Sequence, residues 1–124
     1  MARRATVCPD TSDGWVEISD RELANVGASL RGKASHDAVI DHALRATETI
    51  LKALIWKRNG WSEWPKNSGK NRDLYRHDLK HMLQETGLED PLLVNPERAA
   101  SWQTLINANE KQHRYSQNNG HLEK

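Results

Sequence analysis

The residues best suited to chemistry lie close together between positions 72 and 81. This stretch holds two arginines, each followed by a histidine at the same spacing: Arg72 precedes His77, and Arg76 precedes His81. An arginine can hold a phosphate through two parallel hydrogen bonds, and a histidine can give or take a proton near neutral pH. That combination is suited to cleavage of an RNA phosphodiester. We therefore take Arg72 and His77 as candidate catalytic residues.

Three further side chains beside the catalytic pair, Arg76, Lys80 and His81, are candidates for binding. By their spacing alone, Glu48 and Lys52 in the preceding helical pattern form an ordinary i, i+4 helix pair. On one continuous helix, Arg76, His77, Lys80 and His81 would share a face opposite the apolar residues. The alternative is a solvated polar face that happens to contain histidines.

His77 and His81 also have the spacing of two metal ligands on one helix. A catalytic zinc ion needs a third ligand, which only a distant part of the chain could supply. No glutamate stands between the two histidines, so the metalloprotease pattern is not met. We predict no metal site and no cofactor.

Size, charge and composition favour one soluble domain. The chain of 124 residues is 36% hydrophobic, which fits one modest core. Its formal net charge of +1 means that any contact with RNA would be local. The single cysteine excludes an internal disulfide, as is usual in a reducing cytoplasm. Because no apolar run could serve as a secretory signal or a membrane span, we expect a cytoplasmic protein without membrane contact.

Helical periodicity and cap residues predict four helices and no strand. Ser19 and Glu22 form a capping box at the start of the first helix, and Asn95 followed by Pro96 begins the last. The strongest pattern belongs to the second helix, where adjacent apolar pairs recur every three to four residues. The expected helices cover about 19–32, 35–60, 72–85 and 95 onward. The predicted fold is an all-α, four-helix up-and-down antiparallel bundle.

The domain is expected to span residues 19–115. Residues 1–18 contain turn-forming residues without apolar periodicity, and residues 116–124 are equally polar. We expect a mobile N-terminal segment, 1–18, and a mobile C-terminal tail, 116–124.

Three tryptophans lie around the loop that follows the second helix: Trp56, Trp61 and Trp64. They could stack on the bases of single-stranded RNA. They could also close one end of the bundle or form a dimer interface. We favour packing or dimerisation.

Residues 48–54 read Glu-x-x-Leu-Lys-Ala-Leu and are followed by a glycine and a loop, and residues 77–83 begin with His-Asp-Leu. In these segments the chain resembles the HEPN family (higher eukaryotes and prokaryotes nucleotide-binding domains): residues 48–54 look like the end of its central helix, which precedes a glycine and a variable loop. Residues 77–83 match its His-Asp-Leu motif, and Arg114-Tyr115 is similar to the end of its last helix. The similarity extends over about residues 20–115, in the same order.

This resemblance implies a dimerising helical bundle of toxin–antitoxin, phage-defence or RNA-processing systems. Many HEPN members are metal-independent endoribonucleases, in which an arginine and a nearby histidine of each subunit meet at the dimer cleft. Arg72 and His77 would take those roles here. Other members are non-catalytic interaction or nucleotide-binding modules, and Glu48, Lys52 and His77 would then be polar contacts. The expected partners are RNA, a second copy of the chain, and a nucleotidyltransferase or an antitoxin.

Overall fold

The computed structural model describes the backbone of residues 8–32 and 35–122 and the side chains of residues 8–32 and 35–112. All regular structure in these residues is helical, which confirms the all-α class. The elements are α1 (Ser12–Arg31), α2 (His36–Asn59), the 3-10 helix η1 (Gly69–Tyr75), α3 (Leu79–Thr86), α4 (Glu89–Leu93) and α5 (Pro96–Leu122). None of the helices described is long and apolar enough to cross a membrane.

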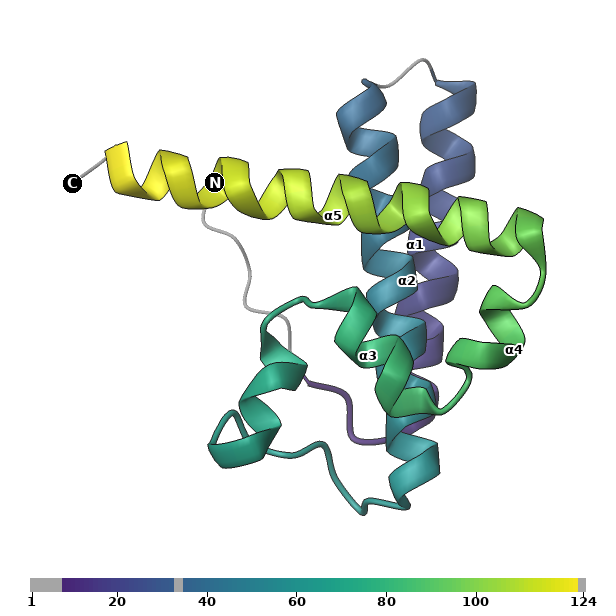
Figure 1. Ribbon diagram of the computed structural model, residues 1–124, viewed down its shortest axis with the longest axis vertical. Helices are drawn as coiled ribbons and strands as arrows, with labels where there is room; N and C mark the ends of the chain where they lie inside the picture. Colours follow the sequence, from purple (N-terminus) through teal and green to yellow (C-terminus); the bar gives the residue numbers. More distant parts are fainter. Residues whose placement is uncertain (1–7, 33–34, 123–124) are drawn as a thin grey trace.

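Helices α1 and α2 form a long hairpin (Figure 1); α3 and α5 pack on α2, and α4 packs on α3 and α5. The predicted start of α1 at Ser19 is wrong, because Thr11 caps the helix earlier and accepts a hydrogen bond from the Gly14 amide. Ser19 is instead buried, and its hydroxyl donates to the Ala46 carbonyl on α2 at 2.8 Å. The predicted boundary at residue 19 therefore cuts through a packed helix. Residues 1–7 lie outside the described part.

The second helix begins and ends as predicted. The Ser35 side chain accepts from the Ala38 amide at its start, and Gly60 adopts the left-handed conformation that ends it. Its buried face meets the tryptophans of the loop. The Trp64 ring lies 5.8 Å from that of Trp56 and 5.8 Å from that of Trp61, and these rings pack together at one end of the hairpin. The tryptophans therefore pack against one another, which is one of the two roles that the sequence analysis favours for them.

The predicted third helix, 72–85, is wrong, because the chain turns in its middle. Residues 72–75 belong to η1, and α3 begins only at Leu79. His77 has a φ of 59°, in the left-handed region, which is incompatible with a continuing α-helix. Asp78 then caps α3 by accepting from the His81 amide at 3.1 Å. The predicted common face of Arg76, His77, Lys80 and His81 therefore does not exist.

The last helix begins where the sequence predicts it. The Asn95 side chain accepts from the amides of Glu97 and Arg98, and Pro96 occupies the first helical position. The backbone of α5 is helical as far as Leu122, beyond the predicted domain end at residue 115. In Figure 1, α5 crosses the α1–α2 pair instead of running alongside it, unlike the helices of an up-and-down bundle.

Candidate functional site

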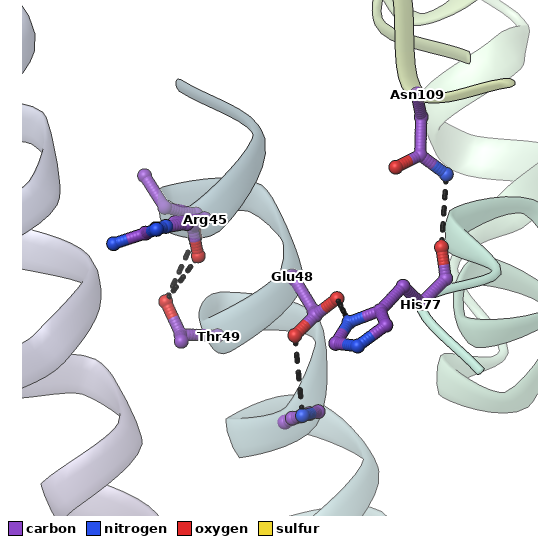
Figure 2. A network of polar contacts seen from close by, with 7 residues as sticks. Arg45, Glu48, Thr49, His77 and Asn109 are labelled. Atoms are coloured by element: carbon purple, nitrogen blue, oxygen red, sulfur yellow. Dashed lines mark hydrogen bonds and ion pairs between the residues drawn. The ribbon is translucent and has the colours of Figure 1, made fainter. Parts of the chain in front are cut away.

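The centre of the candidate site is a hydrogen-bonded pair, His77 and Glu48 (Figure 2). The Nδ1 atom of His77 lies 2.6 Å from Oε1 of Glu48. The two residues come from different elements, since His77 occupies the turn between η1 and α3, and Glu48 lies in the middle of α2. The His77 side chain is 57% exposed and that of Glu48 only 18%. The imidazole thus faces solvent, while its carboxylate partner is largely covered.

Glu48 is held in its ionised form. Burial alone would raise the pKa of this carboxyl, but the hydrogen bond with His77 and the charge of Lys52 outweigh burial, and the pKa is lowered. An ionised carboxylate can only accept hydrogen bonds, so Nδ1 of His77 must carry the proton that it donates.

Lys52 lies one turn after Glu48 on α2, and its Nζ atom is 3.2 Å from Oε2 of Glu48. Its side chain is only 9% exposed. The same Nζ atom lies 4.8 Å from the ring centre of Trp15 and 6.0 Å from that of Trp64. The resemblance to HEPN domains suggested Lys52 as a binding residue, and the structure places its ammonium group among covered side chains.

A cavity of about 200 Å³ opens beside His77. Its walls are Arg76, His77, Asp78, Asn109 and Glu110. Asn109 donates from Nδ2 to the His77 carbonyl at 2.8 Å, which ties α5 to the turn (Figure 2). Neither α5 residue was selected as a site residue from the sequence. Asn109 continues the stripe of Trp102 and Ile106 at helical spacing, and a polar residue on such a stripe either lies where the core ends or borders a cleft.

The other candidate residues are distributed around this centre. Arg76 lines the cavity, and its guanidinium lies 3.2 Å from the Asp73 carboxylate. Lys80 is exposed on α3. The His81 Nε2 atom faces Asp73 at 3.8 Å and Glu85 at 3.7 Å.

Arg72 is exposed on η1 and lies outside the lining of the cavity. The structure therefore joins Glu48 to Lys52 and to His77, and it places Arg76 beside His77 in the lining of the cavity. Arg72 is not part of that group.

Within residues 8–32 and 35–112, no group of three or more His, Cys, Asp or Glu side chains is arranged to hold a metal ion. His77 and His81 lie on different elements, one in the turn and one on α3. They therefore do not lie one turn apart on the same helix, as two metal ligands with this spacing would.

A second pair of the same kind joins α1 to α2. The Nδ1 atom of His42 lies 2.6 Å from Oε2 of Glu22, with the side chains 27% and 13% exposed. Sequence reasoning did not select this pair, because the partners are brought together only by the packing of the two helices.

The sequence matches no known protein-family model, and no curated protein and no solved structure matches the chain. The resemblance to HEPN domains therefore remains an expectation from the residues quoted above.

Proposed function

We propose that the protein is a HEPN-like RNA-binding protein that acts as a metal-independent endoribonuclease of a toxin–antitoxin or phage-defence type. The single observation that carries the proposal is the His77–Glu48 pair, an exposed imidazole held by a covered carboxylate beside a cavity that also contains Arg76. A histidine oriented by a carboxylate is a common proton-transferring group.

In this mechanism, neutral His77 removes the proton from a ribose 2′-hydroxyl through Nε2. The 2′-oxygen attacks the adjacent phosphorus, the bond from phosphorus to the 5′-oxygen breaks, and a 2′,3′-cyclic phosphate forms. The departing 5′-oxygen receives a proton from a second imidazole. A homodimer that joins two cavities would supply this imidazole, as the HEPN resemblance implies.

We assign the phosphate contact to Arg76, because this arginine lines the cavity together with His77. Arg72, the sequence candidate, lies on η1 and away from the cavity lining. The guanidinium of Arg76 would leave Asp73 and pair with the phosphate, which offers two oxygens in a matching geometry.

The test is cleavage of end-labelled single-stranded RNA in EDTA. Wild-type protein should cleave, and Arg76→Met should lower the rate by about tenfold or more, since a charge-assisted contact contributes about 1.5–3 kcal/mol. Arg72→Met is the matched control and should stay within about twofold of wild type. Intact RNA with wild-type protein at micromolar concentration would refute the nuclease assignment. Light scattering tests the dimer.

One observation favours a second function, that of a non-catalytic interaction or nucleotide-binding module. Asp78 and Glu110 line the same cavity, so its walls carry both signs of charge, and a polyanion is not the only partner that suits them. A nucleotidyltransferase or an antitoxin is the expected partner under this reading. Absence of cleavage, together with calorimetric binding of a nucleotide that Glu48→Gln abolishes, would replace the nuclease by this function.

A further inference from the structure

Lys52 is placed unlike an ordinary surface lysine. It is almost fully covered, and its ammonium group is enclosed by Glu48 and by the faces of two tryptophan rings. Covering a cation costs free energy unless a negative charge and aromatic faces compensate for the lost water. Here both are present. An ammonium group in this position has little access to a ligand in solvent, so its role must be exerted through its neighbours.

The neighbour that connects Lys52 to the candidate site is Glu48. One carboxylate oxygen, Oε2, faces Lys52, and the other, Oε1, faces His77. A carboxylate held at both oxygens has a fixed orientation. The chain of contacts therefore runs from the covered ammonium group, through the carboxylate, to the exposed imidazole.

We propose that Lys52 is a positioning residue for His77, which keeps Glu48 ionised and oriented so that the imidazole carries its proton on Nδ1. This inference rests on the proposed role of His77 in proton transfer. Arg76, Asp78 and Glu110 face His77 from the turn and from α5, but these three residues are exposed, and solvent screens their charges. Lys52 is covered, so its effect on Glu48 is screened less.

The experiment compares three variants on α2. Lys52→Met removes the charge and keeps an unbranched side chain that is one atom shorter, while Lys52→Arg keeps the charge. Lys57→Met is the matched control, since Lys57 lies on the same helix with a side chain 59% exposed. Carbon NMR of the glutamate carboxyls follows the ionisation of Glu48, and nitrogen NMR of the histidine rings shows which nitrogen of His77 carries the proton.

Lys52→Met should raise the pKa of Glu48, because the charge of Lys52 lowers this pKa and its removal leaves the effect of burial less opposed. It should also reduce the fraction of His77 protonated on Nδ1 and slow RNA cleavage by about tenfold, a part of the effect of a proton-transferring group. Lys52→Arg should keep the pKa of Glu48, the fraction of His77 protonated on Nδ1 and the rate of RNA cleavage close to those of wild type. If Lys52 had only a structural role, Lys52→Met would lower the free energy of unfolding and leave the titrations of Glu48 and His77 unchanged.

A folded Lys52→Met protein whose Glu48 and His77 titrations match those of Lys57→Met would overturn the inference. If Lys52→Met does not fold, Lys52→Gln, which keeps an N–H donor without the charge, gives the same comparison. The NMR measurements contain no RNA. Failure of wild-type protein to cleave RNA would therefore refute the nuclease and leave the result on Lys52 readable.

Discussion

Two of the histidine–glutamate pairs in the described part of the chain, His42–Glu22 and His77–Glu48, have the same contact and different surroundings. In both, Nδ1 of the histidine lies 2.6 Å from a glutamate oxygen. His42 and Glu22 join two long helices, and both lie in regular helical backbone. His77 lies in a turn with a positive φ, and its partner Glu48 also faces a covered lysine.

Exposure separates the two imidazoles further. The side chain of His77 is 57% exposed and borders a cavity, and that of His42 is 27% exposed between α1 and α2. A substrate can approach the first ring more easily than the second. The short hydrogen bond between imidazole and carboxylate is common to both pairs, so it does not distinguish them. The proposed role of His77 depends instead on its exposure, the adjoining cavity and the covered lysine.

The largest difference between the pairs is expected in catalysis. His77→Asn should lower the rate of RNA cleavage by about 100-fold or more, the usual contribution of a proton-transferring group. Asparagine tolerates the left-handed conformation, so the turn before α3 should persist. His42→Asn should retain a rate within about threefold of wild type, since its imidazole is proposed only to join helices. Equal losses in both variants would show that the effect comes from folding.

The second difference concerns stability, measured by double-mutant cycles in urea. Glu22→Gln with His42→Asn should give a coupling energy of about 1–2 kcal/mol, because both partners are largely covered. Glu48→Gln with His77→Asn should give about 1 kcal/mol or less, because the imidazole is more exposed and solvent weakens the contact. A larger coupling for the exposed pair would contradict this division between packing and chemistry.

The sequence predicts those parts of the fold that depend on neighbouring residues, and it misses those that depend on tertiary contacts. The start and end of α2 and the start of α5 depend on local caps, Ser35, Gly60 and Asn95, and they were predicted correctly. The turn at His77 was not predicted, because apolar residues continue at helical spacing from Tyr75 to Leu83 across the break. A tertiary contact with Glu48, 29 residues earlier, accompanies the unfavourable backbone of His77.

The start of α1 was missed for a related reason. Residues 12–18 show no apolar periodicity, yet Trp15 is buried against Trp64, with the two rings 5.6 Å apart. That contact forms only after the loop folds back on the hairpin. Among the site residues, residue type and spacing indicated His77, and the resemblance to HEPN domains indicated Glu48. Their pairing, the covering of Lys52, and the contribution of Asn109 depend on packing that no local pattern encodes.

The smallest expected difference is in the pH dependence of stability, and it concerns Glu48. The pKa of this carboxyl is lowered in the folded protein, despite burial, by His77 and Lys52. The folded state therefore binds a proton at Glu48 less readily than the unfolded chain, whose ordinary value is 4.5. This contribution to stability is present above that value and is lost as the pH falls through the folded pKa.

Glu48→Gln should consequently flatten the acid limb of the stability curve. Wild type should lose more free energy of unfolding than the variant between about pH 6 and pH 3, because the variant has no carboxyl to protonate at this position. Urea unfolding at several pH values measures the difference, with Asp37→Asn, an exposed carboxyl in the first turn of α2, as the control. Parallel curves for wild type and Glu48→Gln would mean that the contact with His77 and Lys52 does not favour the charged form.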